Sequence, residues 1–319
     1  MERKLENLRW KPMWVSHLGC ISGCLQYLNL DVSDAWLFGA TGHAFVINIH
    51  EVVCPSGPTA WRTEMLFKLG SNIGYAIEGV FGFKSQGDFA EKQKLAWEHT
   101  KRAIDQGLPC YGWELDIPEF CAVYGYDDQG YYFSGPGCDS GKGPKPWKEL
   151  GDTEIGVLEM YSVRPGQAAD DIKTVKEAIA FVLEHSTSPA KWIFPKYKAG
   201  VAGFDNWIQA VDTKKADGFG MAYNAQVWSE CRDFAVAFLR EAKDRLGRKW
   251  AGLFDEAIGH YEVGAANLRA VSDTFPFHGL KPEHIEDESR LRTALEHLRQ
   301  AREAEASGLK ALERIATEL

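Results

Sequence analysis

The apolar residues follow different patterns in the two halves of the chain. In the first half, helical spacing predicts one helix over residues 18–28 and a second over residues 92–106, which Gly107 and Pro109 end. Short runs rich in β-branched and aromatic residues predict strands. These runs cover residues 44–53, 110–116, 120–126, 131–134 and 155–163. The turn Asp127-Asp128-Gln129-Gly130 joins two of them as a hairpin.

Long amphipathic stretches dominate the second half. They predict helices over residues 170–184, 223–246 and 250–271, and from residue 286 to the end of the chain. The change of pattern falls at Val163-Arg164-Pro165-Gly166, which we interpret as a linker. The fold class predicted is therefore α+β, with an α+β domain over residues 1–163 and an all-helical domain over residues 164–319.

Composition narrows the classes of protein that fit this pattern. A hydrophobic fraction of 45% in 319 residues can bury a large core. The formal net charge of -9 argues against nucleic acid and anionic membranes as partners, because basic faces usually bind both. Residues 1–13 carry mixed charges, and no window reaches the roughly 18 apolar residues that span a bilayer. We expect neither a signal peptide nor a membrane helix.

The chain contains seven cysteines, an odd number. Without a secretory leader, this count favours reduced thiols and a cytoplasmic location. Cys20 and Cys24 do not form a C-x-x-C motif, and no second Cys or His pair at zinc spacing completes a site. We therefore expect no metal site and no cofactor.

The segment Ser16-His17-Leu18-Gly19-Cys20 opens the first predicted helix. A thiol in the first turn of a helix has a lowered pKa, and the free N–H groups there can hold an oxyanion. Cys20 is therefore the candidate nucleophile, and Cys24 is interpreted as a core residue one turn deeper. The alternative is that both cysteines are small packing residues.

Two histidines are candidates for the base that such a thiol needs. His43 follows the Gly-rich segment Gly39-Ala40-Thr41-Gly42 and precedes a predicted strand, where an imidazole can face a pocket. His17 lies on the Cys20 helix and is a candidate for the base or for ligand contact. The alternative for His43 is a satisfied structural role.

Acidic residues gather between two predicted strands, at Trp113-Glu114-Leu115-Asp116-Ile117-Pro118-Glu119. On an extended segment, Glu114 and Asp116 point to the same side. Beside Trp113, these carboxylates can bind a cation, an amine or a sugar, and a close pair can divide acid and base roles. The alternative is an exposed polar edge.

One stripe of the second half also combines polar and aromatic residues. Asn224, Trp228 and Cys231 share a face of the helix predicted over residues 223–246. They can form one wall of a pocket, with Asn224 contacting a ligand. A helix-packing stripe with a buried asparagine is the alternative.

Several segments of the first half resemble the N-terminal domain family of the butirosin biosynthesis protein H, a papain-like group related to double-glycine peptidases. The matching segments are the Cys-bearing helix, residues 32–39 with the Gly-rich turn after them, residues 105–109, and the hairpin over residues 123–132. The resemblance covers about residues 13–163. It implies a papain-like cysteine-hydrolase fold for this half and acyl or peptide transfer through a thioester.

The sequence departs from that family at the residues that assist the cysteine. In the family, a His begins the strand before Gly-Tyr-Asp and an Asp-Pro often ends the next strand, but these positions fall near Glu119-Phe120 and Gly135-Pro136. Counting back from Asn29 by the family's usual helix length reaches Ser16 rather than Cys20. Without an imidazole a thiol lacks a base, and a nearby Glu119 would raise its pKa.

Three functions follow as hypotheses. The first is a thiol-dependent hydrolase or acyltransferase acting on a small molecule or peptide, with Cys20 as nucleophile, His43 or His17 as base, and Glu119 at the position of the family's His. The second is a catalytically silent papain-like module that binds a small molecule in an acidic, aromatic cleft. The third is a carboxylate-based enzyme. The helical half is interpreted as a lid or a homodimer surface.

Overall fold

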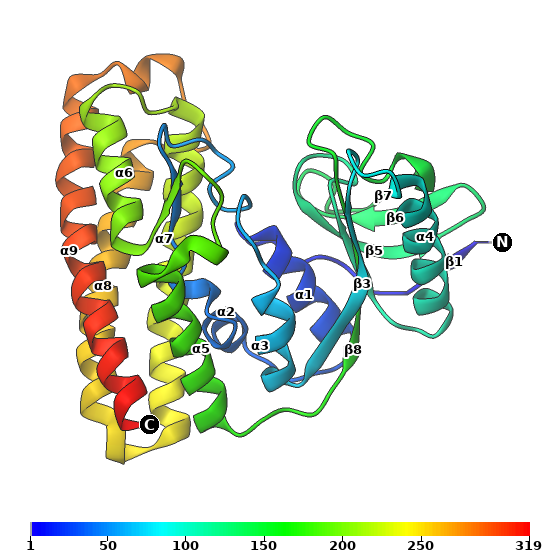
Figure 1. The fold of residues 1–319 in the computed structure, drawn as a ribbon, viewed down its shortest axis with the longest axis horizontal. Coiled ribbons are helices and arrows are strands. Elements are labelled where there is room, and N and C mark those ends of the chain that lie inside the picture. Colours follow the sequence, from blue (N-terminus) through cyan, green and yellow to red (C-terminus); the bar gives the residue numbers. More distant parts are fainter. Residues whose placement is uncertain (1) are drawn as a thin grey trace. The chain divides into compact units, whose positions relative to one another are not determined.

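The computed structural model of the chain, which describes residues 2–319, has the α+β architecture that the sequence predicts (Figure 1). An antiparallel sheet is built from the first half of the chain, and helices dominate the second half. The chain divides into two compact units. The first unit comprises Met1–Val32 and Gly74–Ala168, and the second comprises Ser33–Ile73 and Ala169–Leu319.

The sequence predicted a single boundary after residue 163, whereas each unit of the structure is made of two separate segments. The segment Ser33–Ile73 belongs to the helical unit, because its first helix, α2 (Asp34–Ala40), packs on α7 (Gly218–Leu246). The two helices approach so closely at Gly39 that a Cβ there would lie 1.8 Å from Cγ of Phe238. Only glycine allows this contact, which the sequence suggested merely as a turn.

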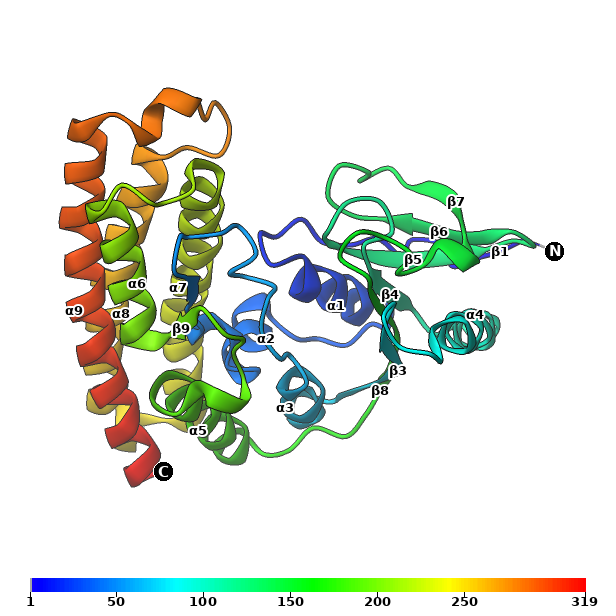
Figure 2. The same cartoon turned by 45° about the horizontal axis from the view of Figure 1, so that its top comes forward.

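The first unit contains a seven-stranded antiparallel sheet in its described part. The strand order is β3-β8-β4-β5-β6-β7, with β1 paired to β5. Helix α1 (Ser16–Tyr27) and helix α4 (Phe89–Asp105) cover opposite faces of this sheet (Figure 2). The strands are β1 (Arg3–Lys4), β3 (Tyr75–Phe83), β4 (Cys110–Trp113), β5 (Phe120–Tyr126), β6 (Gly130–Ser134), β7 (Lys142–Pro146) and β8 (Val157–Pro165).

The predicted hairpin is confirmed. Strands β5 and β6 pair antiparallel, and Oδ1 of Asp127 accepts the N–H groups of Gln129 (2.8 Å) and Gly130 (3.1 Å). The sequence missed the edge strand β3, because glycines interrupt its β pattern. Gly79 is needed there, since a Cβ would lie 2.1 Å from the carbonyl oxygen of Met160 on β8.

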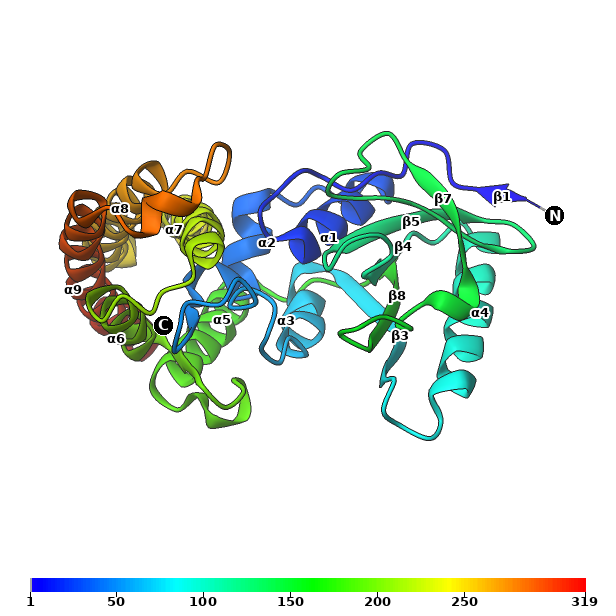
Figure 3. The same cartoon turned by 90° about the horizontal axis from the view of Figure 1, so that it is seen from above.

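The second unit is a helical bundle with a short two-stranded sheet, β2 (Asn48–His50) and β9 (Tyr197–Ala199). Helices α6 to α9 run side by side and are seen nearly end-on in Figure 3. The helices of this unit are α2, α3 (Met65–Ile73), α5 (Asp171–Thr187), α6 (Gly200–Asp212), α7, α8 (Ala251–Thr274) and α9 (Glu288–Glu318). The helical half that the sequence predicted is thus confirmed, with α6 added.

A buried arginine organises the start of this unit. Arg232 on α7 is 0% exposed, and its guanidinium lies 3.0 Å from Oε2 of the buried Glu305 on α9. It also donates hydrogen bonds of 2.7, 3.1 and 3.2 Å to the carbonyls of Ala44, Phe45 and Val46. The single strand predicted over residues 44–53 is therefore wrong. Three consecutive carbonyls can meet one guanidinium only in a turn, because carbonyls along a strand alternate in direction, and a 3₁₀ turn (His43–Phe45) precedes β2.

Candidate functional site

Helix α1 begins at Ser16, two residues before the start that the apolar spacing predicted. Cys20 is consequently the fifth residue of the helix and lies beyond its first turn. The prediction that Cys20 occupies the first turn is wrong, because the spacing of apolar residues marks the buried face and not the polar residues that open the helix. The side chain at the helix start is the hydroxyl of Ser16.

The thiols of α1 lie in the core. Cys20 and Cys24 are each 0% exposed. Burial raises the pKa of both thiols well above the ordinary value, and for Cys20 the neighbouring Cys121 and Cys24 add to this effect. Cys20 is therefore a protonated thiol out of contact with solvent, which is the packing alternative weighed from the sequence.

Ser16 connects the start of α1 to the start of strand β5. Its hydroxyl donates a short hydrogen bond to Oε2 of Glu119 and accepts the backbone N–H of Phe120 at 3.0 Å. Ser16 is 4% exposed, whereas Glu119 is partly exposed. The structure thus brings together the two positions at which the sequence resemblance placed a nucleophilic cysteine and a histidine.

His17 begins a row of polar aromatic residues beneath α1. Its Nε2 lies 3.1 Å from the Tyr111 hydroxyl on β4, and its ring stacks on Phe120 with centroids 4.0 Å apart. Tyr111 pairs with Tyr161 across β4 and β8, with ring centroids 5.4 Å apart. The Tyr161 hydroxyl then donates a hydrogen bond of 2.9 Å to Glu159. The His17 ring therefore already has partners within the chain, Tyr111 and Phe120.

Glu159 is the acidic residue of this row that sequence reasoning missed. It keeps partial exposure, and burial raises the pKa of its carboxyl to about 7 although the bond from Tyr161 opposes the shift. It pairs in the β3–β8 register with Phe81, which is 49% exposed. The signal in the sequence was a glutamate on the same face as a tyrosine, two residues away in a strand.

The acidic segment between β4 and β5 is not extended. Strand β4 ends at Trp113, and Glu114 has a φ of 55°, so the expected common side for Glu114 and Asp116 is wrong. Glu114 is buried and accepts a hydrogen bond of 2.7 Å from Thr153, whereas Asp116 pairs with Lys142 at 2.6 Å. The three carboxylates therefore have three different partners within the first unit.

Trp113 has no hydrogen-bond partner for its indole N–H among the described residues. The side chain is buried, and its ring packs against Phe120 with centroids 5.0 Å apart. Trp113 directly follows Gly112, which pairs with Met160 on β8. The register therefore places Trp113 beside Glu159 in the sheet.

His43 and Asn224 belong to the second unit and are used in its core. Nδ1 of His43 lies 3.8 Å from the Cys231 sulfur, its ring packs against Trp61, and burial lowers its pKa to about 3. Asn224 donates both amide hydrogens, at 3.0 and 2.9 Å, to carbonyls of the chain, and accepts the indole N–H of Trp228 at 3.0 Å. These contacts match the structural alternatives for both residues.

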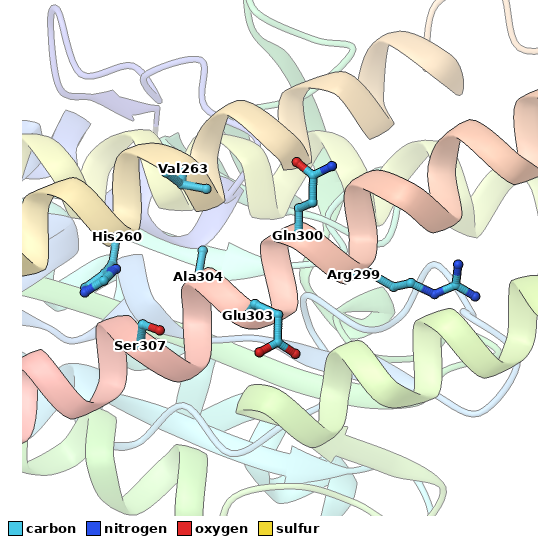
Figure 4. Close-up of a pocket in the computed structure, with 7 residues that line it drawn as sticks. All are labelled: His260, Val263, Arg299, Gln300, Glu303, Ala304 and Ser307. Carbon is cyan, nitrogen blue, oxygen red and sulfur yellow. The ribbon is translucent and has the colours of Figure 1, made fainter.

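Two surface hollows lie away from these residues. One, of about 460 Å³, is formed between α8 and α9, and Figure 4 shows the side chains that line it. The other, of about 480 Å³, lies along α4 in the first unit. The first is lined by His260, Val263, Arg299, Gln300, Glu303, Ala304 and Ser307, and the second by Glu98, Lys101, Arg102, Asp105, Gln106 and Tyr126.

Comparisons with known proteins add no relatives. A scan against protein-family models and a search of curated proteins found no match to this chain. Within residues 2–319, no helix combines the length and apolarity needed to cross a membrane. In the same part of the chain, no group of three or more His, Cys, Asp or Glu side chains is arranged to hold a metal ion.

Proposed function

We propose that this chain is a papain-like protein without thiol catalysis, and that it binds a small organic amine on the sheet face beneath α1. The observation that carries the first part of the proposal, the loss of thiol catalysis, is the hydrogen bond between Ser16 and Glu119. These residues stand where the resemblance places the family's cysteine and histidine. A serine and a glutamate provide neither a thiolate nor an imidazolium, so the thioester route of the family is closed.

Cys20 does not replace the missing nucleophile in this proposal. Its thiol is fully buried, and both its burial and the nearby thiols favour the protonated form. Acyl transfer needs a thiolate that a substrate carbonyl can approach to about 3 Å. The first sequence hypothesis therefore has less support than the second, the silent binding module.

The binding part of the proposal rests on Glu159 and its aromatic neighbours. Glu159 pairs with the exposed Phe81 on β3, and extending the β4–β8 register one residue past Gly112–Met160 places Trp113 on its other side. A partly buried carboxylate beside aromatic rings suits an organic cation, because it pairs with the charge while the rings cover the apolar part. With a pKa of about 7, Glu159 loses a proton when a cation binds beside it. Affinity should consequently rise with pH through this value.

Thiol labelling tests the loss of thiol catalysis. Native protein is treated with iodoacetamide, and separately with an acyl N-acetylcysteamine thioester, and the modified residues are located by mass spectrometry. We expect alkylation at the partly exposed Cys54, and no acyl adduct at Cys20 until the chain is unfolded in urea. A Cys54→Ser variant removes the labelling expected in the native state. Rapid acylation of Cys20 in the native protein would disprove this part of the proposal.

A ligand panel tests the binding site. Small aromatic and aliphatic amines and the matched neutral alcohols are screened by calorimetry against the wild type and a Glu159→Gln variant. We expect binding of at least one amine, weakened about tenfold or more by Glu159→Gln, with affinity rising between pH 6 and 8. The exposed Glu91→Gln, on α4, is the matched control. Equal binding of amines by both variants removes Glu159 from the site.

The Ser16–Glu119 pair also favours a second candidate, a serine hydrolase with a carboxylate base. The hydroxyl already donates its proton toward the carboxylate, as a nucleophile must. Against it, Ser16 is nearly inaccessible and one of its lone pairs accepts the N–H of Phe120. A fluorophosphonate probe separates the two candidates: labelling of Ser16, abolished by Glu119→Gln, would favour the hydrolase over the binding module.

A further inference from the structure

Two cysteines of the first unit, Cys121 and Cys138, lie on segments that the fold brings together. Cys121 is on β5, and Gly135 follows directly after β6, the strand paired with β5. The backbone at Gly135 passes so close that a Cβ there would lie 2.4 Å from the Cys121 sulfur. Gly135 therefore places the start of the following turn directly over the Cys121 thiol.

The turn that begins at Gly135 carries Cys138. The N–H of Cys138 donates to the carbonyl of Gly135 at 2.9 Å, and the carbonyl of Cys138 accepts the N–H of Gly141, also at 2.9 Å. These bonds fold the turn back toward β5. Besides burial, the two thiols influence each other: Cys138 raises the pKa of Cys121, and Cys121 lowers the pKa of Cys138. Cys138 is 9% exposed, whereas Cys121 is 0% exposed.

We propose that Cys121 and Cys138 are an oxidisable pair that forms a reversible disulfide with a hydroperoxide as oxidant. Cys138, the more exposed thiol, attacks the peroxide; the O–O bond breaks, one oxygen leaves as water or alcohol, and Cys138 becomes a sulfenic acid. The Cys121 thiol then attacks the sulfenic sulfur, and the second oxygen leaves as water. The two thiols lose two electrons and two protons in total, and the peroxide is reduced.

Cys20 is the neighbouring thiol that the pair must be distinguished from. Burial raises its pKa, and Cys121 and Cys138 raise it further, but the thiol lies on α1 and has no exposure. Burial raises the pKa of Cys121 and of Cys138, so oxidation is slow without peroxide at millimolar concentration. A disulfide would attach the turn that carries Cys138 to β5. The attachment point, Cys121, lies two residues after Glu119, the residue that contacts Ser16.

The experiment uses the full chain with Cys54→Ser, which removes the partly exposed cysteine and leaves six of the seven thiols. The protein is treated with hydrogen peroxide, quenched with catalase and titrated for thiols in denaturant. We expect the count to fall from six to four, with a mass loss of about 2 Da, and to return to six with dithiothreitol.

Peptide mapping identifies the bond. No Lys or Arg lies between residues 103 and 141, so one tryptic peptide holds Cys110, Cys121 and Cys138. Cleavage before aspartate separates these three residues, because Asp116 and Asp127 lie between them. A peptide pair linked through Cys121 and Cys138, cleaved by dithiothreitol, is the expected product.

Matched variants make the result decisive. Cys54→Ser with Cys138→Ser should keep all five of its thiols after the same treatment, whereas Cys54→Ser with Cys231→Ser should fall from five to three. Any of three results would overturn the proposal. The first is a linkage from Cys20 to Cys121, and the second is the loss of two thiols in the variant that lacks Cys138. The third is oxygen added at Cys138 without a linkage.

Discussion

The two units bury polar groups in different ways. In the second unit, Arg232 and Glu305 form an ion pair with no exposure on the arginine, and the neighbouring His43 is enclosed by aromatic rings. In the first unit, Glu119 and Glu159 keep partial exposure while each accepts a hydrogen bond from a buried hydroxyl. Fully enclosed charges serve structure, and partly exposed carboxyls are the ones that can still exchange protons or meet a ligand.

The largest predicted effect tests the enclosed ion pair. Arg232→Met leaves Glu305 buried without its cation and three backbone carbonyls without their donor. We expect a loss of about 3–5 kcal/mol from the free energy of unfolding of the second unit. Hydrogen exchange during a urea titration measures it on α9 peptides separately from β5 peptides. Lys214→Met, at an exposed ion pair with Glu288, should produce no resolvable change.

The next effect concerns the buried histidines. Burial lowers the pKa of His185 to about 4, below the ordinary value of about 6.5 in an unfolded chain. As the pH falls through 6.5, His185 binds a proton in the unfolded chain but not in the folded unit, so stability is lost until the pH reaches about 4. We expect a loss of about 2 kcal/mol from this histidine between pH 7 and pH 5.

The histidine prediction has its own test. In a His185→Leu variant, the difference in unfolding free energy between pH 7 and pH 5 should be smaller than in the wild type by that amount. Glu159 of the first unit should act in the opposite sense, because its folded pKa of about 7 is raised and its contribution is lost as the pH rises. Equal pH dependence in the wild type and His185→Leu would contradict the assignment.

A smaller effect is expected at the start of α1. Ser16→Ala removes the donor to Glu119 and leaves the N–H of Phe120 buried without an acceptor. We expect the first unit to lose about 1.5–2 kcal/mol of unfolding free energy, with the second unit unchanged. Urea unfolding followed by hydrogen exchange of β5 measures the change. Ser16→Cys, which keeps a weak donor and acceptor, should lose less.

The smallest effect separates the two carboxylates of the β4–β5 segment. Thr153→Val removes the hydroxyl that donates a hydrogen bond to Glu114. The change should lower the free energy of unfolding of the first unit by about 1 kcal/mol. Asp116→Asn breaks only a surface contact with Lys142 and should leave the midpoint of urea unfolding unchanged. If Asp116→Asn were the more damaging change, this distinction between the carboxylates would be wrong.

Strands β4, β5, β6 and β8 and the long helices were predictable from the sequence, because their apolar periodicity and turn residues agree with the fold. Strand β3 was not, and the strand expected over residues 44–53 was wrong. The site was predictable only in part. Counting along the helix pointed to Ser16, and the missing imidazole pointed to Glu119, yet their hydrogen bond depends on packing between α1 and β5. Local sequence likewise drew attention to His43 as a base. Its actual contacts are with Cys231, far along the chain on α7, and with Trp61, in a loop.

The order of segments along the chain has a consequence for synthesis. Ser33–Ile73 is made early but belongs to a unit whose other residues begin only at Ala169. The first unit can therefore be completed on the ribosome while this early segment is still waiting for its partners. Gly39 and the carbonyls that meet Arg232 stay unprotected until α7 emerges. A single truncation of the gene yields neither unit by itself, because residues 1–168 still include Ser33–Ile73 and residues 33–319 still include Gly74–Ala168.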